Sequence, residues 1–206
     1  MQKKYQLEIL DEKMVGPDPF VLFDKWYNQA VEAKVNSPTA MTLATSSPAG
    51  VPSARIVLLK GFSELGFLFF TNYNSRKGQE ISKNQNVALL FHWTELGRQV
   101  RVEGYAMKTT DKISTDYFDS RSFESRISAS VSEQSQPIPG REYFEKLWNL
   151  KQSKLSGSKI ERPANWGGYI IIPRRIEFWQ FRQNRLHDRV LYQLEDEKWK
   201  ISRLAP

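Results

Sequence analysis

The sequence predicts one mainly β domain with flanking helices (α+β), in which antiparallel strands close into a barrel or sandwich. After residue 40, alternating and short apolar runs dominate, which is typical of strands. Short turns separate these runs, and such turns join antiparallel neighbours because parallel strands need long crossovers. The chain has 206 residues, 40% of them hydrophobic, and shows no internal repeat. This length and composition suit a single packed core.

The amino-terminal part predicts an arm followed by a helix. Residues 1–17 are expected to form a flexible arm, and residues 18–206 the single domain. Asp18 is a favoured N-cap residue, and Pro19 suits the first position of a helix. Apolar residues then recur every three to four positions. This spacing predicts an amphipathic helix that continues to about Lys34.

Turn residues divide the rest of the chain into strands and a few helices. The expected strands are residues 40–45, 53–59, 66–71, 87–93, 98–107, 168–172, 175–181, 190–194 and 198–204. The expected helices are residues 75–82, 110–120 and 141–151, and residues 153–165 are expected to form a surface loop.

The charge favours a small anionic ligand. The formal net charge is +7, with 30 Lys and Arg against 23 Asp and Glu. An excess of positive charge attracts anions such as nucleic acids and phosphorylated metabolites. The cations are spread along the chain, without the block of like charges that is typical of a nucleic-acid arm. A phosphate-bearing small molecule is therefore the favoured ligand, and a basic nucleic-acid-binding barrel is an alternative.

Several classes of site are excluded or disfavoured. The chain has no cysteine, which excludes disulfides, thiolate nucleophiles and cysteine-based zinc sites. The two histidines, His92 and His187, provide few metal ligands, so no metal is expected. No G-x-G-x-x-G or P-loop motif is present. The amino terminus lacks the apolar segment of a signal peptide, and no apolar run could span a bilayer, so we expect a soluble, cytoplasmic protein without membrane partners.

Two cationic segments are candidates for binding an anion. Residues 55–60 alternate on a strand, with Arg55 on one face and Lys60 on the other. This pattern fits an ordinary half-buried strand or a strand beside an anionic ligand. Arg76 and Lys77 open an expected helix, where free backbone N–H groups and partial positive charge favour phosphate. A capped helix with solvated cations is the alternative.

Two further groups combine hydrogen-bonding side chains. Tyr117 and Arg121 are four residues apart, so they share a helix face and could clamp a phosphate with Ser125 or form a surface pair. In an extended segment, Arg185, His187 and Arg189 would project to one side, away from Asp188. Two cations beside an imidazole favour a ligand site over a charged turn.

Five motifs in order along the chain resemble the pyridoxine 5′-phosphate oxidase family. They are RIVLLK at 55–60, TN-x-x-SRKG at 71–78, RQV at 98–100, EFWQ at 177–180 and RLHDR at 185–189. The resemblance extends from Asp18 to the carboxy terminus. It implies an antiparallel, FMN-binding split β-barrel that forms a homodimer with FMN between the subunits.

The resemblance also assigns roles to residues. The positions that match FMN contacts are Arg55, Ile56, Val57, Leu58, Leu59, Lys60, Phe70, Thr71, Arg76, Lys77, Gln99, Gln134, Ser135, Trp179 and Arg189. The positions that match substrate contacts are Lys60, Tyr117, Arg121, Ser125, Arg185, His187 and, in the arm, Tyr5. Arg185 and His187 are the catalytic candidates. Two positions depart from the family pattern: Phe70 replaces a usual tyrosine, and the arm has Gln2 before Tyr5 where the family often has arginine.

The implied reaction oxidises pyridoxine 5′-phosphate or pyridoxamine 5′-phosphate to pyridoxal 5′-phosphate. A hydride passes to the flavin, and O2 reoxidises the flavin to give H2O2. In such chemistry the cofactor performs the redox step while the protein orients the substrate. A related flavin oxidase of phenazine biosynthesis, with a tricyclic substrate, and a non-catalytic flavin-binding barrel are the alternatives.

Overall fold

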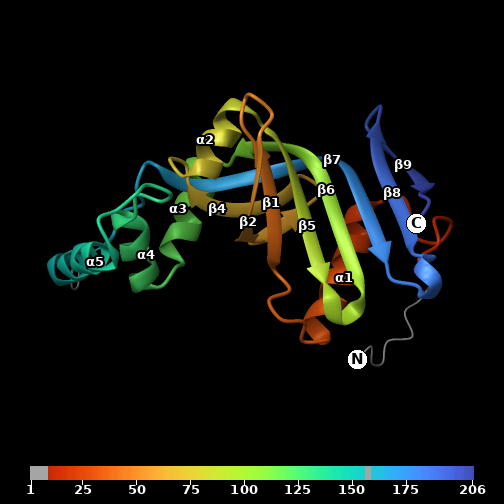
Figure 1. Ribbon diagram of the computed structural model, residues 1–206, viewed down its shortest axis with the longest axis horizontal. Helices are drawn as coiled ribbons and strands as arrows, with labels where there is room; N and C mark the ends of the chain where they lie inside the picture. Colours follow the sequence, from red (N-terminus) through yellow and green to blue (C-terminus); the bar gives the residue numbers. More distant parts are fainter. Residues whose placement is uncertain (1–8, 156–158) are drawn as a thin grey trace.

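The computed structural model describes residues 9–155 and 159–206, which form a curled antiparallel sheet with helices at its face and end (Figure 1). The strands are β1 (Ala40–Ser46), β2 (Pro52–Leu58), β3 (Gly61–Ser63), β4 (Gly66–Asn72), β5 (Asn86–Trp93), β6 (Arg98–Lys108), β7 (Trp166–Gln180), β8 (Asp188–Glu195) and β9 (Lys198–Arg203). The helices are α1 (Pro19–Glu32), α2 (Arg76–Lys83), α3 (Asp111–Asp119), α4 (Phe123–Val131) and α5 (Arg141–Leu155), with short 3-10 turns at Thr94–Leu96 and Gln183–Arg185. The predicted mainly β, antiparallel split barrel with flanking helices is confirmed.

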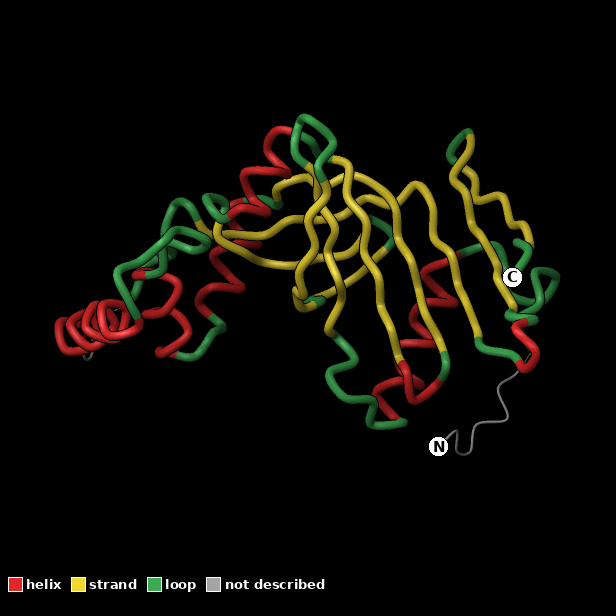
Figure 2. Tube along the Cα trace, viewed as in Figure 1, coloured by secondary structure: helices red, strands yellow, loops and turns green. Residues whose placement is uncertain are grey.

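Strand β7 connects the two ends of the sheet. The strand order is β2-β1-β5-β6-β7-β4-β3, and β8 and β9 continue from β7. The first part of β7 pairs with β4, and its last part pairs with β8. Strand β6 pairs with most of the length of β7. Helices α3, α4 and α5 therefore lie near one end of β7, and β8 and β9 lie at the other (Figure 2).

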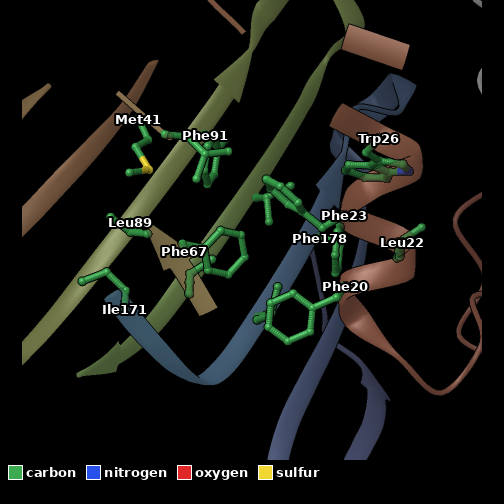
Figure 3. Close-up of a cluster of buried hydrophobic side chains, with 14 of the residues drawn as sticks. Phe20, Leu22, Phe23, Trp26, Met41, Phe67, Leu89, Phe91, Ile171 and Phe178 are labelled. Atoms are coloured by element: carbon green, nitrogen blue, oxygen red, sulfur yellow. The ribbon is translucent and has the colours of Figure 1, made fainter. Parts of the chain in front are cut away.

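Helix α1 covers one face of the sheet with aromatic side chains (Figure 3). The Asp18 carboxylate accepts a hydrogen bond from the Phe20 backbone N–H at 2.8 Å, so the predicted N-cap is confirmed. The Phe23 ring lies 4.9 Å from that of Phe67, and the Trp26 ring lies 5.2 Å from that of Phe178. Edge-to-face pairs of this kind stabilise a core beyond the area that they bury.

A second, smaller cluster packs the helices against the end of the sheet. It consists of Phe118, Ile127, Ile160 and Trp166, all buried. Because Trp166 begins β7 while Phe118 and Ile127 come from α3 and α4, this cluster fixes the two helices beside β4 and β7.

The structure differs from the sequence prediction in four elements. The expected strands 168–172 and 175–181 are one strand, because β7 continues through a bulge: Pro173 pairs with Gly104 of β6 and Arg175 with Glu103, which leaves Arg174 as the extra residue. A Cβ atom on Gly104 would lie 2.1 Å from the Ile172 carbonyl oxygen, so the bulge requires glycine. Strand β3 and helix α4 were not predicted, and α5 extends to Leu155.

Part of the expected arm packs on the last strands. Leu10 is buried, and its carbonyl oxygen accepts a hydrogen bond from Arg203 at 2.9 Å. The Tyr192 hydroxyl donates to the Gly16 carbonyl oxygen at 2.9 Å. Tyr5 lies outside the described residues, and the domain boundary at residue 18 stays a prediction. No helix in the described part of the chain is long and apolar enough to cross a membrane, and the expected cytoplasmic location stays a prediction.

Candidate functional site

A cavity of about 600 Å³ lies where β2 and β4 meet helices α2, α3 and α4. Its lining includes the predicted residues Ile56, Val57, Leu58, Lys60, Phe70, Thr71, Lys77, Tyr117, Arg121, Ser125 and Gln134. Sequence analysis did not identify Asn72, Ser122, Ser128, Ala129, Ser132, Phe144 and Trp166, which also line it. Cationic, hydroxyl and aromatic groups line the cavity, but none of its lining residues is Asp or Glu.

Lys77 is the most buried cation of the cavity, with 8% of its surface exposed. Its Nζ donates to Thr71 Oγ1 at 3.1 Å, to Ser75 Oγ at 3.2 Å and to Gln134 Oε1 at 3.1 Å. All three acceptors are neutral, and no carboxylate pairs with Lys77 among residues 9–155 and 159–206. Burial, together with the nearby charge of Arg55, lowers the pKa of Lys77 to about 8. Buried charges are normally paired, so this ammonium fits an anion from outside the chain.

Arg121 is a second cation without a carboxylate in the described part of the chain. Its guanidinium lies over the Trp166 ring at 4.7 Å, and its buried Nη1 atom has no hydrogen-bond partner among the described residues. Burial lowers the pKa of Arg121. A buried N–H donor without an acceptor costs about 1–3 kcal/mol, so this group also fits a ligand acceptor.

Aromatic stacking orients the neighbours of Arg121. The Tyr117 ring stacks on that of Phe70 with 3.9 Å between centroids, and Lys60 Nζ lies 5.8 Å from the Tyr117 centroid. Ser125, in the first turn of α4, lies 3.0 Å from the Ser122 hydroxyl. The predicted clamp of Lys60, Tyr117, Arg121 and Ser125 therefore lines a single cavity.

The start of α2 directs Lys77 into the cavity. Ser75 caps the helix and accepts a hydrogen bond from the Gly78 N–H at 3.3 Å. A Cβ atom on Gly78 would lie 2.2 Å from the Tyr73 carbonyl oxygen, so only glycine permits this close approach. Arg76, one position before Lys77, is exposed and forms an ion pair with Glu80 at 3.0 Å.

Arg55 is held beside the cavity and does not line it. Its guanidinium contacts Thr45 Oγ1 at 2.5 Å and the Glu80 carboxylate at 3.3 Å. Burial alone would raise the pKa of Glu80, but hydrogen bonds from Ser53, Thr45 and Arg76 outweigh burial and lower it to about 2. Glu80 is thus ionised at neutral pH and connects α2 to β2. Leu59, another predicted contact, is buried in the core.

A second group of predicted residues lies at the far end of β7. Gln99 pairs with Trp179, and Trp179 pairs with Arg189, so the three side chains share one face of the sheet. The cavity residue Trp166 and Trp179 stand near opposite ends of the same strand, which corresponds to about 40 Å of extended chain. Within one chain, the predicted residues therefore lie in two separate places, the cavity and the far end of β7.

The predicted geometry of the segment from Arg185 to Arg189 is wrong. Arg185 has φ +61° at the end of a 3-10 turn, and β8 begins only at Asp188, so Arg185, His187 and Arg189 do not form one extended face. Asp188 pairs with Arg182 at 2.6 Å. Arg189 does not lack an anion either, because Glu177 accepts from its Nε at 2.8 Å, a hydrogen bond that raises the pKa of Arg189.

A backbone hydrogen bond fixes the orientation of His187. The Arg182 N–H donates to His187 Nδ1 at 3.1 Å, and the His187 ring lies 4.5 Å from that of Trp179. A neutral imidazole that accepts at Nδ1 carries its proton on Nε2. His187 is therefore a donor at Nε2 in its neutral form.

The remaining candidates lie outside the cavity. Ser135 is exposed with φ +74° and follows the cavity residue Gln134. The described residues contain no group of three or more His, Asp or Glu side chains that could hold a metal ion. Of the cavity residues that were not identified, Asn72 belongs to the TN-x-x-SRKG motif, and the i, i+4, i+8 spacing of Phe123, Ile127 and Val131 indicates the helix that carries the serines.

The chain is similar to proteins of one family along its length. Residues 27–147 match the profile described as pyridoxamine 5′-phosphate oxidase. Residues 166–206 match the one described as pyridoxine 5′-phosphate oxidase C-terminal dimerisation region. Proteins named pyridoxine/pyridoxamine 5′-phosphate oxidase from Nostoc sp. and Cupriavidus pinatubonensis are 53% and 50% identical, and each alignment covers 100% of this chain and 97% of the relative.

Solved structures give the same result for the fold. PhzG from Burkholderia lata, in complex with tetrahydrophenazine-1-carboxylic acid, has a TM-score of 0.93 at 27% identity, covering 98% of both chains. An FMN-binding protein from Nostoc punctiforme, related to pyridoxamine 5′-phosphate oxidase, has a TM-score of 0.73 at 18% identity, covering 93% of this chain and 100% of that one. The chain belongs to the pyridoxamine 5′-phosphate oxidase family of oxidoreductases.

Proposed function

We propose that this protein binds FMN and oxidises pyridoxine 5′-phosphate or pyridoxamine 5′-phosphate to pyridoxal 5′-phosphate, with O2 as electron acceptor and H2O2 as product. The observation that carries the proposal is a cavity with three cations, Lys60, Lys77 and Arg121, and no lining carboxylate. Such a cavity suits phosphorylated ligands, because phosphate would give the buried ammonium the anionic partner that it lacks and would accept a hydrogen bond from the orphaned guanidinium N–H.

The residues around Lys77 fit the phosphate and ring of FMN. Lys77, Thr71 and Gln134 hydrogen-bond to one another at one side of the cavity, so their polar groups lie together there. Ile56 and Leu58 line the cavity yet are 63% and 45% exposed, as expected of apolar side chains that a flat ring or a partner would cover. When bound, FMN would supply the hydride acceptor, and the protein would supply binding and orientation.

The second part of the cavity fits the substrate phosphate. Arg121 would give its free Nη1–H group, Ser125 its hydroxyl and Lys60 its ammonium. Tyr117 stacks on Phe70, so its hydroxyl has a fixed direction. Phosphate held away from the reacting carbon would place the pyridine ring near the flavin, since binding energy from remote groups can pay for orientation.

We further propose that the protein is a homodimer in which the cavity of one chain meets the far end of β7 from the other. The match of residues 166–206 to a dimerisation region supports this arrangement. A twofold interface brings the same two surfaces together twice, so each dimer would have two complete sites. Gln99, Trp179 and Arg189 would then contact the FMN that the partner's cavity holds.

In such a site Arg185 and His187 would act on the reacting end of the substrate. Arg185 is exposed, and no ion pair holds it among the residues described, so its guanidinium would polarise the substrate oxygen or stabilise developing charge. His187, with Nδ1 occupied by the Arg182 N–H, would donate from Nε2. Its proposed task is to orient the substrate.

An oxidase with a tricyclic substrate is the second candidate, because the PhzG complex has nearly the same fold. The cations Lys60 and Arg121 beside Ser125 favour a phosphorylated substrate over it.

The test is to incubate purified protein with FMN, O2 and each substrate class, and to measure aldehyde and H2O2. Formation of pyridoxal 5′-phosphate supports the proposal. Bound flavin without aldehyde would contradict the activity and leave flavin binding standing, whereas turnover of tetrahydrophenazine-1-carboxylic acid alone would favour the second candidate. A protein that binds no FMN would refute both.

A further inference from the structure

Glu177 lies between two arginines on the outer face of β7, opposite Arg101 and Leu191 and two positions before Trp179. Only 7% of its surface is exposed. One carboxylate oxygen accepts from Arg189 Nε at 2.8 Å, and the other accepts from Arg101 Nη1 at 3.3 Å. The shorter contact is made by the arginine proposed to bind FMN.

Two hydrogen bonds hold Arg189, and the other N–H groups of its guanidinium are available to a ligand. Its Nε–H group donates to Glu177, and its Nη1 donates to the Ala205 carbonyl oxygen at 2.8 Å. A guanidinium carries five N–H donors in a rigid fork. Three N–H donors are therefore left for a ligand. Their direction depends on how Glu177 and Ala205 orient the plane of the Arg189 guanidinium.

We propose that Glu177 is a positioning residue that orients Arg189 toward FMN. This inference rests on the proposed function, because it assigns the ligand of Arg189. Glu177 lies two positions before Trp179 on the same face of β7. It is proposed to act through Arg189 and not by contacting FMN itself. Preorganised donors lose less entropy on binding than mobile ones, so a fixed Arg189 binds its ligand more tightly.

The sign of the effect separates positioning from simple neutralisation. If Glu177 only neutralised Arg189, then Glu177→Gln would raise the local positive potential and strengthen binding of anionic FMN. If Glu177 orients Arg189, the same change weakens binding, because the neutral amide holds the guanidinium less firmly than the carboxylate does.

Arg101→Gln is the matched control. It removes the other ion pair of the same carboxylate, and Arg101 is 48% exposed. It leaves the contact between Glu177 and Arg189 in place.

The experiment measures the FMN dissociation constant by flavin fluorescence in the full-length protein, together with the melting temperature. Glu177→Gln is expected to raise the constant about tenfold, and Arg101→Gln less than about twofold. In an Arg189→Ala background, Glu177→Gln should add almost nothing, because a double-mutant cycle reports coupling through Arg189. Glu177→Asp, which keeps the charge but shortens the side chain, should also weaken binding.

Unchanged or tighter FMN binding in Glu177→Gln would overturn the inference, and so would an equal loss with and without Arg189. If Arg189→Ala alone leaves FMN affinity unchanged, the role of Arg189 in the proposed function fails. If Arg189→Ala weakens FMN binding and the Glu177 variants do not, only the role of Glu177 fails.

Discussion

The two ends of β7 hold their cations in opposite ways. At the Trp166 end, Lys60, Lys77 and Arg121 line a cavity and have no carboxylate partner within the described chain. At the other end, Arg189 is paired with Glu177 and Arg182 with Asp188. The first end is arranged to receive an anion from outside, because its charges are left without partners. The second end is arranged to present oriented groups, because Arg182 and Arg189 are already fixed by carboxylates.

Under the proposed function, this difference explains why neither end alone would make a complete site. The cavity end offers phosphate-binding cations but lacks the predicted catalytic residues. The far end offers Trp179, Arg185 and His187 but has no unpaired buried cation among the described residues. A dimer that joins the two ends combines both properties.

The largest expected effect is on Lys77. Lys77→Met should weaken FMN binding about 10- to 100-fold, because a buried charge-assisted hydrogen bond contributes about 1.5–3 kcal/mol. The measurement is an FMN titration. Lys83→Met, an exposed change in the last turn of the same helix, is the control and should bind FMN normally. Normal FMN binding by Lys77→Met would break the contrast between the two ends.

The next effect is on Arg121. Arg121→Ala should raise the KM for the phosphorylated substrate about tenfold while FMN affinity stays the same, since Arg121 lines the part of the cavity that we propose binds the substrate phosphate. Arg126→Ala is the control, because Arg126 also has a buried nitrogen without a partner in the described structure but does not line the cavity. Steady-state kinetics at saturating FMN measures the KM of each variant. Equal KM values for the two variants would contradict the assignment.

The smallest expected effect is the change of FMN affinity with pH. Lys77 has a pKa of about 8, lowered by burial, so it loses its charge as the pH rises above that value. FMN affinity should fall about fourfold between pH 7 and 8.5, and this dependence should vanish in Lys77→Met.

The stability of the FMN-free protein should change in the opposite direction. Between pH 8 and the ordinary lysine pKa of 10.5, the unfolded state binds a proton on Lys77 that the folded state has lost. The free energy of unfolding therefore rises with pH in this window. Chemical denaturation at pH 8 and 10 measures this rise, and a fall attributable to Lys77 would contradict the lowered pKa.

Much of the fold follows from local patterns in the sequence. The N-cap at Asp18 and the alternation in the strands depend on neighbouring residues, so they could be predicted. The continuity of β7 through Pro173 could not, because it depends on pairing with another strand, β6, whose Gly104 lies opposite Pro173 at the bulge. Helix α4 was missed because its serine-rich sequence hides three apolar residues at helical spacing.

The candidate site was predictable where it depends on motifs, and less so where it depends on tertiary pairing. Apart from Phe70, the cavity residues from Ile56 to Lys77 lie in two short motifs. Glu80 and Glu177, which hold the arginines, are distant from their partners Arg55 and Arg189 in the sequence. The left-handed backbone of Arg185 is likewise not encoded by side-chain alternation, so the extended geometry predicted for it was wrong.

Subunit complementation tests the central claim most directly. Lys77→Met disables the cavity end and Arg185→Ala the far end, so a heterodimer of the two has one intact site and one doubly defective site. Random exchange of subunits should then restore about a quarter of wild-type activity, because half of the dimers are mixed and each has one working site. A mixture no more active than the two variants measured separately would show that each site is built within one chain.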